Sequence, residues 1–311
     1  MAAAAVSSAD AALVARVPAL LQALRHLDGS ADKNTEPTLR ELLDVFFAGK
    51  ISVPTYPAAV AALLDGDLVS LLLARCDEAS PGGWPLVVLL QATFVSAPAR
   101  DRVGLAGFHL LGFAEHDAAL APSILKILRN VAISETVTTS IYLEAGLATL
   151  RQLCSCCDRF SSIEAFQLLG NVLCDASNAE MQAVSEFVTV VWLDKHLRQF
   201  VSLAPDLAVA HGVVYVCGCF LSEPGFEEAM RPLYHYFAIA LSCLSTLPLS
   251  EDLVDMTECS ALCLINSATP GLATYSAQAA VTLVHSQPGA LASMAFLAVK
   301  RSPGLWVKMC S

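Results

Sequence analysis

Apolar residues recur along most of this chain at the three- and four-residue spacings of a helix face, as Val17, Leu20 and Leu24 do near its start. Short breaks at proline, glycine, aspartate and serine separate the apolar runs. Pro85 and Pro122 stand where a new run begins, a position that proline favours in helices. No stretch sustains the apolar and polar alternation of a half-buried strand. The pattern therefore predicts an all-α protein.

Four short segments of similar character recur along the chain. Each is an apolar helix end built around Asn or Gly, followed within a few residues by Ser, Glu or Pro and then by another helix. Asn130, Asn171, Gly218 and Asn266 mark their register with spacings of 41, 47 and 48 residues, and Gln91 is a weaker member 39 residues before the first. Spacings of about 40 to 47 residues are typical of HEAT and armadillo arrays, whereas tetratricopeptide and ankyrin units repeat at about 33 or 34.

Residues 123–156 resemble an armadillo repeat. They contain the Leu-x-Asn-Val-Ala end of a third helix, a short first helix, and a Glu-Ala-Gly turn that leads through Gly146 into the second helix. Glycine suits this sharp turn because it has no side chain. Residues 163–200 keep the Leu-Gly-Asn sequence around Asn171 but lack the Glu-Ala-Gly turn. The resemblance implies an armadillo-like α-α superhelix, a right-handed solenoid of helical hairpins and triplets.

The repeat spacing also predicts how the chain is divided. Residues 1–83 are expected to form a divergent N-terminal helical capping region, and residues 84–311 about five armadillo-like repeats continuous with it. A single helical unit cannot cover its own apolar face, so neighbouring units stack and share a core, and the terminal units act as caps. The expected repeats lie near residues 84–121, 122–160, 161–204, 205–249 and 250–311.

Armadillo proteins bind extended peptides along a concave groove lined by their third helices, where asparagine amides hydrogen-bond the ligand backbone. An amide suits this task because it offers both a donor and an acceptor to a peptide unit. By resemblance, Asn130, Asn171 and Asn266 form this partner-binding ladder. The alternative is that these side chains cap helix ends or bond backbone between units, and the sequence leaves both interpretations open.

The positions one turn before the ladder asparagines carry further candidate side chains. Lys126 and Gln167 lie there and are expected to line the same concave face, and Val214 or Tyr215 takes this place in the next unit. Nuclear-import receptors of the armadillo family have tryptophan at this position, and this chain has none there. The resemblance therefore implies a peptide-binding surface without the specificity for nuclear signals.

Charge narrows the class of partner. The chain has 18 basic and 29 acidic residues, a formal net charge of -11 at pH 7, and no stripe of Lys and Arg. We expect no nucleic-acid partner, because clustered basic side chains are needed to neutralise phosphates. A protein or extended peptide of basic or mixed charge fits better. Glu251, Asp255 and Glu258 fall on one face of an expected helix and are a candidate contact for it, although we favour the alternative, a solvated face at a helix start whose dipole they satisfy.

The hydrophobic fraction of 55%, against 15% charged residues, predicts a large core and raises the question of membrane spans. The two most apolar stretches, 207–221 and 232–249, contain His211 and His235 and are broken by glycine or proline. Both are expected to be buried helices, so no membrane span is predicted. Because no secretory signal is recognised, the 11 cysteines are expected to be free thiols in the reducing cytoplasm.

The densest thiol cluster is Cys154, Cys156 and Cys157, and a zinc site there would need a second pair of ligands that the chain lacks. We expect these thiols to pack as small core hydrophobes. The same packing is expected of Cys174, Cys217 and Cys219. The chain also lacks the Gly-Lys-Ser/Thr, Gly-x-Ser-x-Gly and His-Glu-x-x-His motifs, so no metal, cofactor or catalytic residue is expected.

These observations favour a non-catalytic protein-binding scaffold or adaptor that uses the concave face of an armadillo-like solenoid. A second hypothesis is a structural subunit built permanently into a large assembly, such as cytoskeletal or ciliary machinery, in which subunit interfaces would bury surplus apolar surface. A helical enzyme or a membrane protein is a third hypothesis, which the sequence favours less.

Overall fold

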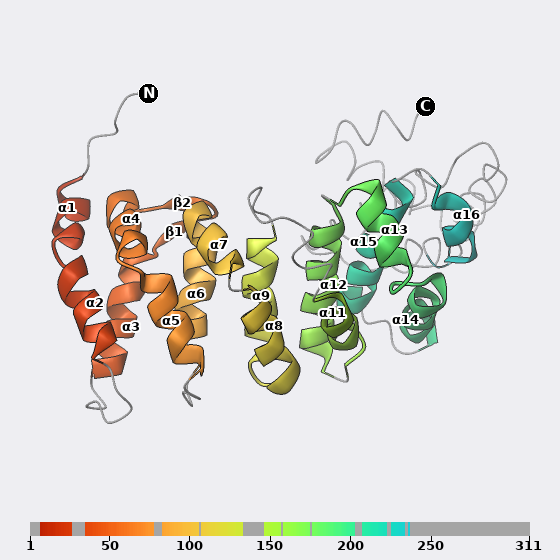
Figure 1. The fold of residues 1–311 in the computed structure, drawn as a ribbon, viewed down its shortest axis with the longest axis horizontal. Helices are drawn as coiled ribbons and strands as arrows, with labels where there is room; N and C mark the ends of the chain where they lie inside the picture. Colours follow the sequence, from red (N-terminus) through yellow and green to blue (C-terminus); the bar gives the residue numbers. More distant parts are fainter. Residues whose placement is uncertain are drawn as a thin grey trace, which may run out of the picture. The chain divides into compact units, whose positions relative to one another are not determined.

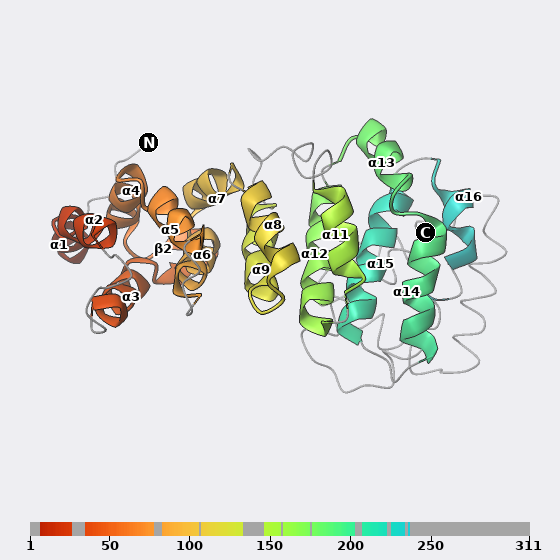
Figure 2. The same ribbon diagram turned by 60° about the horizontal axis from the view of Figure 1, so that its bottom comes forward.

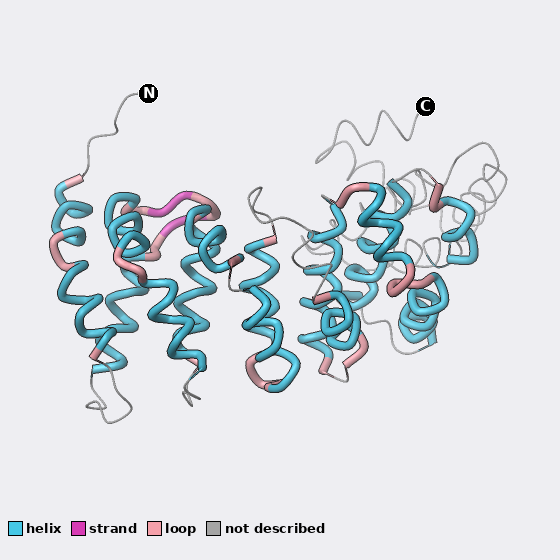
Figure 3. Tube along the Cα trace, viewed as in Figure 1, coloured by secondary structure: helices cyan, strands magenta, loops and turns pink. Residues whose placement is uncertain are grey.

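The computed structural model describes residues 7–26, 35–77, 83–105, 107–132, 146–156, 158–174, 176–202, 207–222, 225–233 and 236. They belong to two compact units, unit 1 (Met1–Thr149) and unit 2 (Leu150–Ser311). Helices make up nearly all of the described residues, drawn in cyan in Figure 3. The all-α prediction is therefore confirmed.

The described helices of unit 1 follow one another along the chain (Figure 1). They are α1 (Ser8–Val14), α2 (Val17–Arg25), α3 (Thr35–Phe46), α4 (Pro57–Asp65), α5 (Leu68–Asp77), α6 (Trp84–Val95), α7 (Ala97–Gly104), α8 (Gly107–His116) and α9 (Ala121–Val131). A further helix, α11 (Leu147–Cys154), runs across the boundary between the units. The starts of α6 and α9 carry Pro85 and Pro122 in their first turn, as the sequence predicts.

The helices of unit 1 repeat in groups of three, and the third helices of the groups are α3, α6 and α9. The middle one, α6, packs against both α3 and α9. In Figure 2 these three succeed one another along the lower side of unit 1, whereas α4 and α7 lie along the upper side. Successive third helices share a core in which Trp84 and, on α9, Ile124 and Leu128 are buried. This sharing is how stacked repeats cover apolar faces that one repeat alone would expose.

Hydrogen bonds inside each unit join residues separated by about one repeat. Their separations along the chain lie between 37 and 48 residues. The pairs are Phe47 with Gln91, Ser52 with Arg100, and Thr93 with Asn130 in unit 1, and Ser155 with His196, Asn171 with Tyr215, and Asp194 with Tyr236 in unit 2. Contacts at this one recurring separation are expected when each repeat touches only its neighbours.

The first turn of α4 is capped by a residue from another helix. Tyr56, which flanks the start of α4, makes no side-chain cap. Instead the carboxylate of Asp10 on α1, only 2% exposed, accepts hydrogen bonds from the backbone amides of Ala58 at 3.1 Å and Ala59 at 2.8 Å. Asp10 thus satisfies two amides that α4 cannot bond internally and places a negative charge at the positive end of the helix.

Replacing Asp10 by alanine is expected to destabilise the α1–α4 contact by about 1 to 1.5 kcal/mol, because two buried amides lose their acceptor. Hydrogen exchange of the first-turn amides of α4 should become roughly tenfold faster. The matched control is Asp44→Ala, which removes an exposed carboxylate from α3 and should leave this exchange unchanged. Equal acceleration in the two variants would contradict the capping role.

A two-residue hairpin between α3 and α4 is an addition to the predicted helices. Its strands, β1 (Gly49–Lys50) and β2 (Val53–Pro54), pair antiparallel, with Gly49 opposite Pro54. The turn is held by Arg100, 6% exposed, whose guanidinium donates to the Ser52 hydroxyl at 2.7 Å and to the Thr93 carbonyl at 3.0 Å. The hairpin is therefore anchored to α6 and α7.

Unit 2 continues the helical pattern. Its described elements are α12 (Arg159–Cys174), α13 (Asn178–Ser185), α14 (Val190–Ser202), α15 (Leu207–Ser222), α16 (Glu227–Met230) and the 3-10 turn η1 (Arg231–Leu233). Ser177 and Glu180 form a reciprocal capping box that begins α13. The two long helices α12 and α15 pack against each other, and α14 packs on α15. Phe166 and Phe220 lie fully buried in this core.

Two expectations about chain organisation stay predictions. The boundary at residue 83 between a capping region and the repeats falls inside unit 1, and the last expected repeat, 250–311, lies outside the described residues.

Among the described helices, none alone has the length and apolar character needed to cross a membrane, but α4 and α5 together do by length and composition, with a bend of 64° between them. The apolar stretch at 207–221 lies in α15, where its described side chains from Val213 to Leu221 are mostly buried in protein.

Candidate functional site

The third helix α6 presents an amide between two apolar side chains. Val87, Gln91 and Phe94 follow one another at the spacing of a single helix face. Val87 and Phe94 are each 39% exposed, which is unusual for large apolar residues of a core helix. The half-buried Gln91 donates from Nε2 to the carbonyl of Phe47 at 3.1 Å. This face offers apolar contacts and an amide that is already fixed in direction.

The next third helix, α9, carries two of the predicted site residues. Lys126 is exposed and the half-buried Asn130 lies one turn later on the same side. Asn130 donates from Nδ2 to the Thr93 hydroxyl of α6 at 3.3 Å. Its amide oxygen has no hydrogen bond to any residue that the structure describes. The hydrogen bond to Thr93 joins neighbouring repeats of unit 1 through a side chain and not through backbone, so both interpretations of Asn130 stay open.

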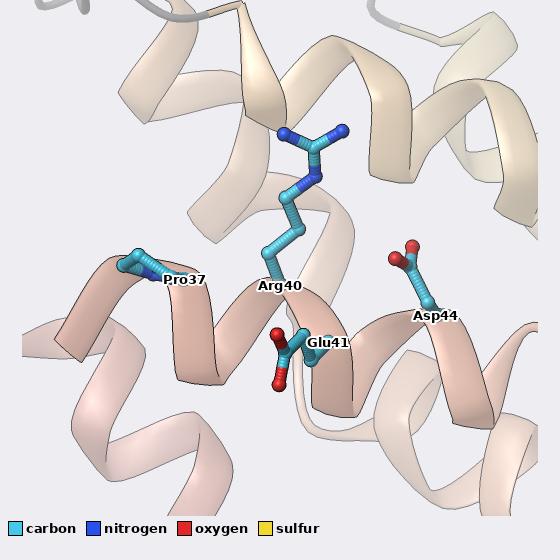
Figure 4. Close-up of a pocket in the computed structure, with 4 residues that line it drawn as sticks. All are labelled: Pro37, Arg40, Glu41 and Asp44. Carbon is cyan, nitrogen blue, oxygen red and sulfur yellow. The ribbon is translucent and has the colours of Figure 1, made fainter. Parts of the chain in front are cut away.

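The third helix at the start of the series, α3, has a different chemistry. Pro37, Arg40, Glu41 and Asp44 line a shallow pocket of about 370 Å³, and all four are exposed. Figure 4 shows Arg40 and Asp44 rising from one side of α3 and Glu41 turned to another. The third helices of unit 1 thus pass from side chains of both charges on α3 to apolar and amide groups on α6 and to Lys126 and Asn130 on α9.

In unit 2, α15 ends the triplet α13, α14 and α15, and α12 packs against α15 as α6 packs against α9, so α12 and α15 are the third helices of this unit. They carry the remaining described site residues. Gln167 and Asn171 are half-buried and one turn apart on α12. The Asn171 amide oxygen accepts a hydrogen bond from the Tyr215 hydroxyl of α15 at 3.2 Å. The sequence leaves open whether Val214 or Tyr215 lies on the exposed face. Val214 is fully buried and Tyr215 is half-buried, so Tyr215 is the residue on that face.

Two glycines allow α12 and α15 to approach closely. A Cβ at Gly170 would overlap the ring of Tyr215, and a Cβ at Gly212 would lie 2.5 Å from the Cβ of Phe166. Each helix therefore inserts an aromatic side chain over a glycine of the other. Tyr215 reaches Asn171 only because Gly170, the residue before it, has no side chain.

The other predicted contacts fall elsewhere. Asn266 and the acidic group Glu251, Asp255 and Glu258 lie outside the described residues. Gly218, the register residue of α15, brings no side chain to the face. The described candidate residues therefore form two separate groups: Lys126 and Asn130 with the added Gln91 in unit 1, and Gln167 and Asn171 with the added Tyr215 in unit 2.

A serine and a histidine meet in unit 2, which is the pairing that nucleophilic catalysis would need. The Oγ of Ser155 lies 3.2 Å from Nε2 of His196 and accepts a hydrogen bond from the Trp192 indole at 3.1 Å. His196 is 6% exposed and packs edge-on against Phe166 and Trp192. Burial, and secondarily Lys195, lower the pKa of His196 to about 4. Such an imidazole is a poor proton acceptor at neutral pH, so the cluster fits packing better than catalysis.

The cysteines follow the core prediction in part: Cys156 is half-buried, and Cys157 lies outside the described residues. Cys154, Cys217 and Cys219 are buried, and burial raises the pKa of the Cys154 thiol, with Cys156 adding to the effect. Cys174 is exposed, so its assignment to the core is wrong: it ends α12 on the same face as Asn171. Among the described residues no group of His, Cys, Asp and Glu could hold a metal ion.

Sequence comparisons find no match for this chain, neither among protein-family models nor among curated proteins. Solved structures do resemble it. A computationally designed armadillo repeat protein for modular peptide recognition is 17% identical, with 80% of this chain and 99% of that chain covered and a TM-score of 0.60. An engineered protein is 18% identical over 94% of this chain and 70% of its own, with a TM-score of 0.64.

A third similar structure is the complex of SYS-1 with POP-1, at 15% identity and a TM-score of 0.57, with 82% of this chain and 50% of that chain covered. At these identities the likeness shows the fold alone. Together with the helical triplets of each unit, it shows an all-α, armadillo-like fold, and the predicted fold class is confirmed.

Proposed function

We propose that this armadillo-like chain is a non-catalytic scaffold or adaptor that binds another protein, taking an extended segment of the partner onto its third-helix faces. The observation that carries the proposal is the position of Asn130 and Asn171. Each is half-buried on a third helix, and a hydrogen bond to the neighbouring third helix holds its direction. A held amide loses little conformational entropy when it bonds a peptide backbone.

The surroundings of these amides suggest the chemistry of the partner. In unit 1, Val87 and Phe94 offer apolar contact beside Gln91, and side chains of both charges, Arg40, Glu41 and Asp44, lie one third helix away on α3. An extended segment with apolar side chains complements that face, and the net charge of -11 favours a segment that is also basic. A peptide-recognition design with the same fold provides a precedent for the mode of binding, not for the ligand.

We also propose that the protein works in the cytoplasm, a reducing compartment, and that it needs no cofactor. The described cysteines are thiols and not disulfides, which is usual where glutathione and thioredoxin keep thiols reduced. The pairing of Ser155 with a histidine of low pKa gives no base suited to neutral pH. A binding function needs neither a nucleophile nor a bound group.

Peptides selected on the purified chain from a random library test the proposal. Replacing Asn130 or Asn171 by alanine should weaken binding of the selected peptides about three- to tenfold, the loss of roughly one hydrogen bond. Titration calorimetry of each peptide with each variant measures this change. Hydrogen exchange of the free variants checks that the fold is kept.

The control is Gln182→Ala, which removes an exposed amide from α13, outside the third helices. It should leave every affinity unchanged. If the selected peptides bind both asparagine variants as tightly as the original chain, or lose affinity with Gln182→Ala instead, the third-helix faces are not the binding surface.

Exposed apolar side chains favour a second function, that of a subunit in a large assembly. Ile51 and Val53 on the hairpin are 57% and 63% exposed, and Leu105 and Val191 are 84% and 78% exposed. Interfaces with other subunits would bury such groups. Sedimentation of the purified chain tests this idea: self-association that Ile51→Ser and Val53→Ser abolish supports it, and a stable monomer that resists aggregation at high concentration opposes it.

A further inference from the structure

The end of α12 brings two thiols together on the packed pair of helices. Cys174 Sγ lies 3.6 Å from Cys219 Sγ of α15. Cys174 is exposed and Cys219 is 6% exposed, so one thiol is open to reagents in solution and the other stands behind it. Neither has been given a role by the proposed binding function.

The hydrogen bonds around the two sulfurs fix their positions. Cys219 donates to the carbonyl of Gly170 on α12 at 3.5 Å, and Cys174 Sγ lies 2.9 Å from the Tyr215 hydroxyl. The single hydroxyl hydrogen of Tyr215 points to Asn171, so the Cys174 thiol is the donor to the Tyr215 oxygen. Both thiols are thus oriented across the α12–α15 contact, within about 1.6 Å of the separation of a disulfide.

We propose that Cys174 and Cys219 form an oxidative modification site, a thiol pair that closes reversibly to a disulfide and links α12 to α15. The close approach that Gly170 and Gly212 allow holds the two sulfurs near each other in the reduced state. Cys217, two residues before Cys219, is fully buried and points into the core, so it is not the partner.

The oxidant for this step is a small disulfide such as glutathione disulfide. The Cys174 thiolate attacks one of its sulfurs, and one glutathione thiolate leaves, which gives a mixed disulfide on the exposed cysteine. The Cys219 thiol then loses its proton to water, attacks the Cys174 sulfur, and releases the second glutathione. Two protein thiols and one glutathione disulfide become one protein disulfide and two glutathione thiols, so electrons and protons balance.

Closure changes the hydrogen bonding of the exposed face. A disulfide sulfur carries no hydrogen, so Tyr215 loses the hydrogen bond that it accepts from Cys174, whereas its hydrogen bond to Asn171 does not involve the sulfur. An effect on peptide binding at Asn171 rests on the proposed function, whereas the disulfide itself does not. The test below uses no peptide, so failure of one proposal is distinguishable from failure of the other.

The experiment exposes the full, folded chain to glutathione disulfide, blocks remaining thiols with an alkylating reagent, and maps the cysteines by mass spectrometry of peptides. We expect a linked peptide pair containing Cys174 and Cys219, lighter by two hydrogens than the separate reduced peptides. Dithiothreitol should abolish it. Cys219→Ser should instead accumulate a glutathione adduct on Cys174, which the original chain resolves.

The matched control is Cys217→Ala, which removes the neighbouring thiol of α15 and should keep the linked peptide pair. A second readout is the denaturant concentration that unfolds unit 2, which should rise on oxidation of the original chain and not of Cys174→Ser, because the disulfide constrains the unfolded state. Free, alkylatable Cys174 and Cys219 in the oxidised folded chain, or a glutathione adduct that persists on Cys174, would overturn the proposal.

Discussion

Replacing Gly212 by alanine is expected to destabilise unit 2 by about 2 to 3 kcal/mol, even though alanine favours helices by up to about 1 kcal/mol over glycine. The added methyl group would lie 2.5 Å from the Cβ of Phe166 and 3.6 Å from its Cα. Phe166 is fully buried, and a Cβ cannot move away by side-chain rotation. The helices α12 and α15 must therefore separate.

The matched control is Gly112→Ala on α8, where an added Cβ would meet nothing within 4 Å. There the helix preference acts alone, and unit 1 should gain up to about 1 kcal/mol. Hydrogen exchange of the α12 and α15 peptides, and of the α8 peptide for the control, measures both effects. A loss of stability in Gly212→Ala together with a gain in Gly112→Ala supports close packing of α12 on α15, whereas a gain in both variants would contradict it.

Acidification from pH 7 to pH 5 is expected to weaken unit 2 by about 2 kcal/mol through His196 alone. Burial lowers the pKa of this imidazole to about 4 from an ordinary value of 6.5. Between these two values the unfolded chain binds a proton that the folded chain does not, so stability falls as the pH falls from about 6.5 to about 4. Below that range the loss is complete.

Replacing His196 by phenylalanine should remove most of this pH dependence, because the new side chain is aromatic and does not titrate. Phe166 and Trp192 already surround the position. The stability of unit 2 is measured at pH 7, 6 and 5 by denaturant unfolding, with hydrogen exchange of α14 as the probe. These values give the slope of stability against pH. Carboxylates with lowered pKa values, Asp158 and Glu180, act at lower pH, because hydrogen bonds from the neighbouring serines hold them ionised. An unchanged slope in His196→Phe would show that other groups carry it.

Periodicity was enough to predict the helical class and the armadillo-like fold. The apolar spacing defines helix faces, and a register of about 40 residues leaves stacked repeats as the arrangement that covers them. Of the predicted site residues, Lys126 is exposed and Asn130, Gln167 and Asn171 are half-buried on α9 and α12. Whether they bind a partner is a separate question that the proposed titrations address.

The contacts between repeats could not be predicted from the periodicity of the sequence. Asp10 caps a helix that begins almost fifty residues later, and no local signal links it to Ala58 and Ala59. The hairpin at Gly49 to Pro54 is too short to leave an alternating pattern. These features depend on which helices become neighbours in space, and a residue's own surroundings in the sequence do not contain that information.

Cys174 illustrates the same limit at the site. It ends an apolar run, and its neighbours in sequence suggested a core position, but its place on the helix, three residues after Asn171, turns it to the exposed face. Gly170, beside Asn171, is the feature of the sequence that could have indicated the packing of another helix at this site. Gly170 marks a close approach, and from the register its partner lies near residue 215, which is where Tyr215 packs.

The location of a bound peptide tests the central claim, that the third-helix faces bind the partner, most directly. Hydrogen exchange of the whole chain would be compared with and without a saturating selected peptide. The account predicts slowed exchange concentrated in α6 and α9 of unit 1 or in α12 and α15 of unit 2. Slowed exchange confined to α4, α7 or α13, with the third helices unchanged, would contradict it.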